Sequence, residues 1–174
     1  EELQSDSATE VARAMAKGAL MEARGNSGVI LCQFFKGVAL GLDGKDSFGT
    51  VDLARALRAA SDQAYTAVGN PVEGTLLTVI RRVADAAERS AQASESMPAM
   101  FHELCEAARD AVAATPTMLP VLREAGVVDA GGQGLAVILE GARSYVGGVR
   151  LEVRELEPPE PLGVDSAGPE VSLK

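Results

Sequence analysis

The sequence is poor in the residues that stabilise small disulfide-linked folds and β-sheets. It has two cysteines, no tryptophan and 3% aromatic residues. Few aromatic side chains disfavour a β-sandwich. Cys32 and Cys105 have neither the C-x-x-C spacing of a redox pair nor that of a zinc site, so we expect two buried free thiols in a reducing compartment. This indicates a cytoplasmic protein.

The sequence also lacks clustered positive charge and long apolar runs. The chain has 16 basic and 25 acidic residues, which give a net charge of -9, and no run of lysine or arginine occurs. Nucleic acid is therefore not an expected partner. No stretch is long or apolar enough to cross a membrane, so stable membrane insertion is not expected. His102 is the single histidine, and we interpret it as a helix-surface residue rather than a catalytic base.

Aliphatic residues and alanine are abundant, supplying almost all of the 47% hydrophobic content. These residues favour helix, so the expected fold class is all-α. At 174 residues the chain suits one domain. We place that domain at 1–150. The Pro- and Glu-rich stretch 151–174, with one short extended piece at 151–153, is interpreted as a linker or tail that leads to further domains.

The spacing of apolar residues predicts seven helices. Gly25 is expected to end the first helix in a left-handed conformation, and Asn26 or Ser27 to cap the second. The mixed charges at 81–89 are expected to form an ordinary solvated helix face. The first helix is expected at 8–22, the second from Asn26 or Ser27 to Gly41, and the third at 50–67. The fourth is expected from Thr75 to a loop near Ser94, and the fifth from Pro98. The sixth is expected from a restart at Thr115-Pro116 to about Ala125, and the seventh from about 133 to 145.

Three polar loops that contain glycine each lead into a helix, at 25–28, 72–75 and 129–134. Helix N-termini offer unpaired amides and partial positive charge, which suit phosphate groups. Taken singly, each loop is more readily explained by capping. The glycine surplus of the third loop exceeds that need and suggests a close approach to a ligand. No P-loop motif is present.

Helix parity predicts that these loops lie together. In an up-and-down arrangement successive helices start at alternate ends, so the second and fourth start at the same end. If the short sixth helix does not cross the bundle, the seventh starts there too. The three loops would then share one rim.

Three motifs together resemble a known family: "MEARGNSGVILCQ", "NPVEGTLLTVIRRVADAA" and "TPTMLPVLREAGVVDAGGQGL". They are similar to the nucleotide-binding L domain (DhaL-like) of the dihydroxyacetone kinase family. The version at the N-terminus of bacterial fatty acid kinase, which works with DegV-type fatty-acid-binding proteins, is the most similar. The resemblance covers residues 8–147.

The resemblance implies an antiparallel barrel of eight amphipathic helices that binds ATP and two magnesium ions at one rim. Residues that match the family's nucleotide-contacting loops are then expected to bind nucleotide here. The segment at 26–28 would hold the phosphates, that at 74–76 would lie along the nucleotide, and that at 129–131 would close over it. The implied nucleotide-binding residues are Asn26, Ser27, Gly28, Gly74, Thr75, Leu76, Asp129, Ala130 and Gly131.

One departure from the family concerns the metal site. The family's D-G-D-x-G aspartate loop, which follows its first helix, matches nothing in these 174 residues. We therefore expect the first helix and the metal ligands upstream of this chain, and no metal ligand is assigned within it. Since metal charge is central to phosphoryl transfer, the isolated chain is expected to bind ATP weakly and to be inactive. An apolar seam left by the missing helix would promote a homodimer.

The resulting hypothesis is a kinase domain that donates the γ-phosphate of ATP to a fatty acid carboxylate. The acceptor would be held by the separate DegV-type protein, and no catalytic residue is assigned. The alternatives are a dihydroxyacetone-type kinase L domain and a non-catalytic helical module that binds a partner or a lipid.

Overall fold

A computed structural model describes residues 5–149, and this part of the chain folds into helices without any strand. The expected all-α class is therefore confirmed. The predictions for 151–174 lie outside the described residues. The helices are α1 (Ala8–Glu22), α2 (Gly25–Gly41), α3 (Thr50–Thr66), α4 (Leu76–Gln92), α5 (Met97–Met118), α6 (Pro120–Ala125) and α7 (Ala130–Val146).

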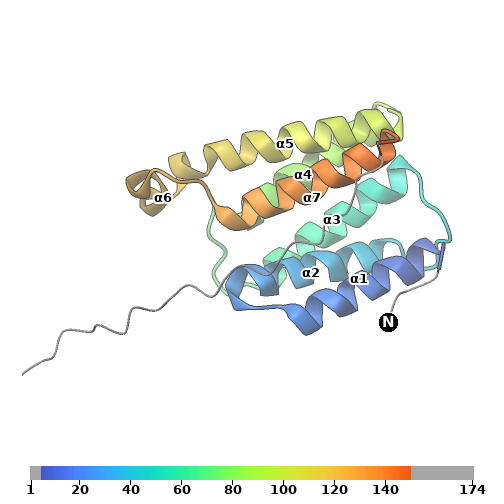
Figure 1. Cartoon of the computed structure of the whole chain (residues 1–174), viewed down its shortest axis with the longest axis horizontal. Coiled ribbons are helices and arrows are strands. Elements are labelled where there is room, and N and C mark those ends of the chain that lie inside the picture. Colours follow the sequence, from blue (N-terminus) through green and yellow to red (C-terminus); the bar gives the residue numbers. More distant parts are fainter. Residues whose placement is uncertain (1–4, 150–174) are drawn as a thin grey trace, which may run out of the picture.

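The long helices run antiparallel to their neighbours in the chain (Figure 1). Each of α1 to α4 packs on the next helix, and α5 packs on α7, which also contacts α4. The central helix α4 is the most buried: Val79, Ile80 and Val83 have no exposed surface. The core therefore forms around α4, and its N-terminus is held by several neighbours.

Small residues allow α2 and α3 to approach closely. A Cβ atom added at Gly37 would lie 2.3 Å from the Cα of Ala60, and one added at Gly41 would lie 2.3 Å from the Cα of Ala56. These distances are far below van der Waals contact. Glycine at both positions thus sets the separation of the two helices.

Both cysteines are free and buried, as expected. Burial, with a smaller contribution from the charge of Glu140, raises the pKa of the Cys105 thiol to about 11. The thiolate is the reactive form, so Cys105 is inert at neutral pH. His102 lies exposed on α5, which agrees with its interpretation as a surface residue. None of the described helices has the length and apolarity needed to cross a membrane.

The prediction that helix six restarts at Thr115-Pro116 is wrong, because α5 continues through Pro116 to Met118. Proline has no amide hydrogen, so Pro116 cannot donate the helical bond to the carbonyl of Val112. The hydroxyl of Thr115 donates to that carbonyl instead, at 2.7 Å. This replacement satisfies the acceptor and lets the helix run on.

Two predicted helix starts are also wrong. Helix α2 begins at Gly25, so Asn26 and Ser27 lie in its first turn and do not cap it. Gly25, with a φ of +63°, is left-handed as expected and turns the chain directly into α2. Helix α7 begins at Ala130, earlier than predicted, because the Asp129 side chain caps it by accepting from the Gly132 amide at 2.6 Å.

Candidate functional site

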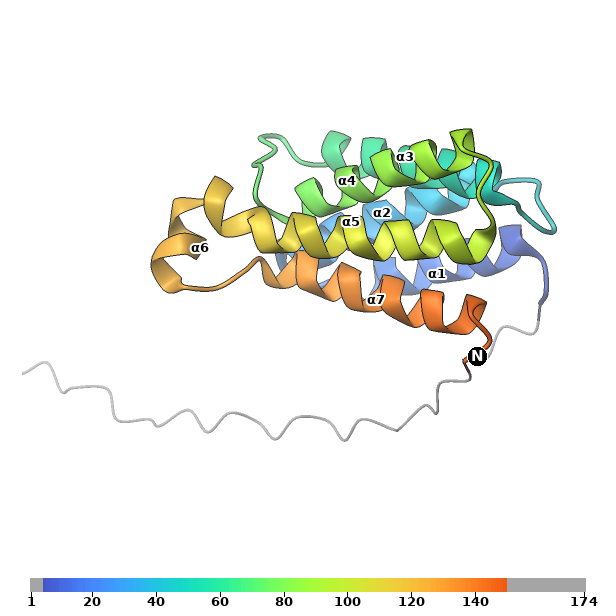
Figure 2. The same ribbon diagram turned by 90° about the horizontal axis from the view of Figure 1, so that it is seen from above.

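Helices α2, α4 and α7 all begin at the same end of the bundle (Figures 1 and 2). The short α6 lies at that end and does not cross the bundle, so the parity argument holds. A Cβ atom added at Gly131 in α7 would lie 3.2 Å from the hydroxyl oxygen of Ser27 in α2 and 3.3 Å from the Cβ of Leu76 in α4. The predicted common rim is therefore confirmed.

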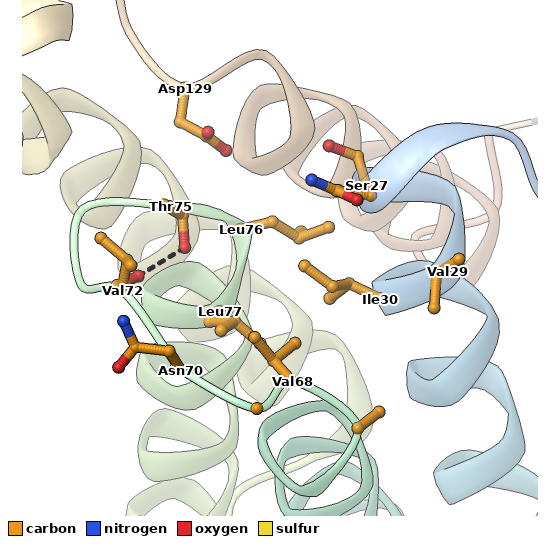
Figure 3. Close-up of a pocket in the computed structure, with 13 residues that line it drawn as sticks. Ser27, Val29, Ile30, Val68, Asn70, Val72, Thr75, Leu76, Leu77 and Asp129 are labelled. Carbon is orange, nitrogen blue, oxygen red and sulfur yellow. Dashed lines mark hydrogen bonds between the residues drawn. The ribbon is translucent and has the colours of Figure 1, made fainter.

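A cavity of about 470 Å³ opens at this rim. This volume is within the usual range for small-molecule sites, roughly 300–1,000 Å³. In Figure 3, the polar side chains of Ser27 and Asp129 lie above that of Thr75. The side chains of Ile30, Leu76 and Leu77 form an apolar surface below Ser27 and Asp129. The lining residues are Asn26, Ser27, Val29, Ile30, Ala67, Val68, Gly69, Asn70, Val72, Thr75, Leu76, Leu77 and Asp129.

The cavity therefore has a polar side and an apolar side. Helix N-termini and polar side chains form the polar side. Branched aliphatic side chains from α2, α4 and the segment between α3 and α4 form the apolar side. A ligand with an anionic end and a flat apolar end matches this division. A nucleotide has both parts.

The amides at two of the three helix N-termini have no side-chain cap. The N-cap residues of α2 and α4, Arg24 and Thr75, make no capping hydrogen bond through their side chains. The Thr75 hydroxyl instead donates to the carbonyl of Val72 at 2.7 Å. The first-turn amides of α2 and α4 are therefore suited to donate to an anion.

The charge around the cavity comes mainly from the backbone. Asp129 is the only charged side chain among the lining residues, and it is acidic. Its Oδ2 atom accepts from the Gly132 amide. No lysine or arginine lines the cavity, so the positive potential available to an anion is that of the helix N-termini.

A buried hydroxyl supports the Asp129 side of the rim. Thr115, which has no exposed surface, accepts a hydrogen bond from the Asp129 amide at 3.1 Å and donates to Val112. The same threonine thus completes the last turns of α5 and fixes the start of α7. Sequence reasoning missed it because the two partners are 14 residues apart.

Comparison with known proteins decides the family. The sequence model of the DAK2 domain family matches residues 1–144 of this chain. The chain belongs to the DAK2 domain family. This agrees with the resemblance to the dihydroxyacetone kinase L domain and places the chain in a kinase-related class.

Bacterial relatives resemble this DAK2 domain over most of its length. Protein YloV of Bacillus subtilis is 43% identical over 141 residues, which are 81% of this chain and 26% of YloV. An uncharacterized protein of Staphylococcus saprophyticus is 43% identical over 132 residues, which are 76% of this chain and 24% of that protein. The chain thus spans about a quarter of the length of these curated relatives.

The predicted nucleotide-binding residues divide into two groups in the DAK2 domain. Asn26, Ser27, Thr75, Leu76 and Asp129 line the cavity. The others lie beside it in the same segments and do not line it. These are Gly28, Gly74, Ala130 and Gly131.

The glycines have packing roles that sequence reasoning did not assign. Gly74 has a φ of +85°, and an added Cβ would lie 2.9 Å from the Cβ of Met118. At Gly132 an added Cβ would lie 2.7 Å from the Cγ2 of Val79. At this position the close approach is therefore to α4 rather than to a ligand.

Sequence reasoning missed most of the apolar side of the cavity. Val68 and Val72 come from the segment between α3 and α4, of which only the polar loop at 72–75 and the residues at 74–76 were singled out from the sequence. A signal was present, because the apolar residues Val68 and Val72 flank the turn residues Gly69, Asn70 and Pro71.

The predicted solvated face on α4 is wrong in part. The Arg58 guanidinium of α3 bridges Asp85 and Glu88, at 2.6 Å from an oxygen of each, and these side chains are partly buried. Arg81 binds Glu73 at 2.8 Å. These five charged groups on α3, α4 and the segment between them therefore link elements together.

Within residues 5–149 no three histidine, cysteine, aspartate or glutamate side chains cluster in a way that could hold a metal ion. Asp129 alone among the cavity residues carries a carboxylate. No chemical step is assigned to a metal on the described residues.

Proposed function

We propose that this DAK2 domain binds ATP in the rim cavity and serves as the nucleotide-binding part of a kinase. The convergence of three helix N-termini on one cavity carries this proposal. The first-turn amides of α2 and α4 supply donors for the phosphates, and the apolar surface formed by Ile30, Val68 and Leu77 suits the base. Family membership supports the kinase-related class.

The acceptor we propose is a fatty acid carboxylate presented by a separate DegV-type binding protein. A carboxylate oxygen would attack the γ-phosphorus of ATP, and the bond from that phosphorus to the oxygen that bridges the β- and γ-phosphates would break. The products would be an acyl phosphate and ADP. The role of the described residues is to bind and orient the phosphates, since such reactions depend chiefly on positioning and charge. We further propose that the magnesium ligands come from a part of the full-length protein other than residues 5–149.

The test is calorimetric titration of Mg-ATP into this chain and into the full-length protein that contains it. We expect weak binding to the chain and tighter binding to the full-length protein. Replacing Asn26 by alanine removes a polar group from the first turn of α2, and the affinity should fall roughly 10- to 100-fold, as for one hydrogen bond to a charged group. Gln92→Ala, exposed at the far end of α4, is the matched control and should leave affinity unchanged.

A second measurement addresses the acceptor. Full-length protein, ATP and a fatty-acid-loaded DegV-type partner should yield an acyl phosphate that hydroxylamine traps as a hydroxamate. Binding of ATP without this product, but with phosphorylation of dihydroxyacetone, would favour the dihydroxyacetone-type alternative. Absence of ATP binding to either protein would contradict the kinase proposal and favour the interaction module.

A further inference from the structure

Four polar side chains form a cluster where the segment between α3 and α4 meets these two helices. Tyr65 belongs to the end of α3, Glu73 to the segment itself, and Thr78 and Arg81 to α4. The Tyr65 hydroxyl donates to Glu73 Oε1 at 2.9 Å, while the Thr78 hydroxyl and Arg81 Nη2 donate to Oε2 at 2.6 Å and 2.8 Å. One carboxylate thus joins the segment to both helices.

The segment that Glu73 anchors forms one side of the cavity. Ala67, Val68, Gly69, Asn70 and Val72 line the cavity, whereas Glu73 does not. The Thr78 hydroxyl also accepts from the Gly74 amide at 2.8 Å, so the same cluster fixes the residue that follows Glu73. Glu73 therefore acts on the cavity only through its neighbours in the chain.

Burial alone does not hold this segment in place. Residues 69–73 are all exposed, and the segment contains two glycines and a proline. Exposed segments with few apolar contacts open at low free-energy cost unless specific bonds restrain them. The Glu73 cluster is the main set of side-chain bonds that restrains this one.

We propose that Glu73 is a positioning residue of the cavity: its carboxylate holds residues 67–75 in the conformation that forms the cavity wall and thereby sets nucleotide affinity. Only the identity of the ligand rests on the proposed function. Burial would raise the pKa of Glu73, but hydrogen bonds from Thr78, Arg81 and Tyr65 outweigh burial and hold that pKa below its ordinary value. The carboxylate is therefore charged at neutral pH and can serve all three donors.

The chain offers a matched control in a second cluster between the same two helices. Arg58 of α3 binds Glu88 through two nitrogens, at 2.8 Å and 2.6 Å, and Asp85 through one. None of these three residues lines the cavity. Glu88→Gln thus removes the same kind of charge from the same helix pair without touching the cavity wall.

The first arm of the test measures amide hydrogen exchange without nucleotide. The reporters are the amides of Val68 and Gly74, which are hydrogen-bonded to the Tyr65 carbonyl and the Thr78 hydroxyl. Loss of a charged hydrogen-bond acceptor should accelerate their exchange about tenfold in Glu73→Gln. In Glu88→Gln their exchange should match the parent chain. Unchanged exchange in Glu73→Gln, or equal acceleration in both variants, would overturn the proposal.

The second arm measures turnover of the full-length protein as a function of ATP concentration. Glu73→Gln should raise KM for ATP about tenfold with little change in kcat, because the wall is misplaced while the phosphate-facing amides stay. Glu88→Gln should change neither. If Glu73→Gln does not fold, Tyr65→Phe removes one donor to the carboxylate and should show the same effects at smaller size.

The two arms separate this proposal from the proposed function. Faster exchange in Glu73→Gln with no ATP binding by the parent protein would uphold the role of Glu73 in the cavity wall and contradict the nucleotide assignment. ATP turnover with a KM that Glu73→Gln leaves unchanged would uphold the kinase and contradict the positioning role.

Discussion

Glycines that share a helix in this DAK2 domain serve different purposes. In α7, Gly132 is buried against Val79, whereas an added Cβ at Gly134 would meet nothing within 4 Å. Sequence reasoning treated both as parts of one glycine-rich loop that approaches a ligand, because the glycine pattern carries no information about what faces each position. The distinction depends on a neighbouring helix that is more than 50 residues away in the chain.

We predict that Gly132→Ala destabilises the fold. The new methyl group would lie 2.7 Å from the Cγ2 of Val79, a fully buried β-branched side chain that cannot turn away. Overpacking of this kind costs about 1–3 kcal/mol. Urea unfolding followed by circular dichroism measures it.

Gly134→Ala is the matched control in the same helix. With open space around the added Cβ, it should stabilise the fold by up to about 1 kcal/mol through helix propensity. A loss of stability in Gly134→Ala as large as that in Gly132→Ala would show that the effect is not one of packing.

At the scale of elements, most helices could be predicted from the apolar spacing. Helix α1 has the expected bounds, Ala8–Glu22, and α3 ends within one residue of its prediction. Apolar periodicity and terminating glycines are local signals, which explains this agreement. The starts of α2 and α7 and the end of α5 were wrong because a turn glycine, a capping carboxylate and a threonine hydroxyl decided them.

Close contact between α2 and α3 leads to a second stability prediction. Gly37→Ala would place a methyl group 2.3 Å from the Cα of Ala60, and backbone cannot rotate aside as a side chain can. The helices must separate, so we expect a loss of about 3 kcal/mol, at the upper end of overpacking effects. Thermal unfolding measures this as a lower midpoint.

Gly18→Ala provides the comparison for that experiment. Gly18 lies in α1, and nothing is within 4 Å of an added Cβ. The substitution should raise the midpoint slightly through helix propensity. If Gly37→Ala and Gly18→Ala shifted the midpoint in the same direction, the close approach of α2 and α3 would not control stability.

At the scale of the whole molecule, the carboxylates of Glu73 and Glu88 make stability depend on pH, because both bond to side chains of α3. Arg58 lowers the pKa of Glu88 by hydrogen bonding, and the cluster around Glu73 lowers the pKa of that residue despite burial. A lowered pKa stabilises the fold above the unfolded value of about 4.5, and this stabilisation disappears as the pH falls through the folded value.

We therefore predict that the free energy of unfolding falls between about pH 5 and pH 3, and that Glu73→Gln combined with Glu88→Gln reduces this fall. Both side chains are more than 40% exposed, so solvent screening limits each contribution to about 1 kcal/mol or less. Urea unfolding at several pH values measures the difference. Identical slopes for the parent and the double variant would contradict the assignment.

The sequence by itself determined the helical class and, through helix parity, the shared rim of α2, α4 and α7. Periodicity and composition are sufficient for this because they act within a few residues along the chain. Only the tertiary structure decided that Glu73 joins Tyr65 to Arg81, that Thr115 supports Asp129, and that Gly132 faces Val79. Each of these depends on which side chains meet across helices, and that is set by packing of the whole bundle.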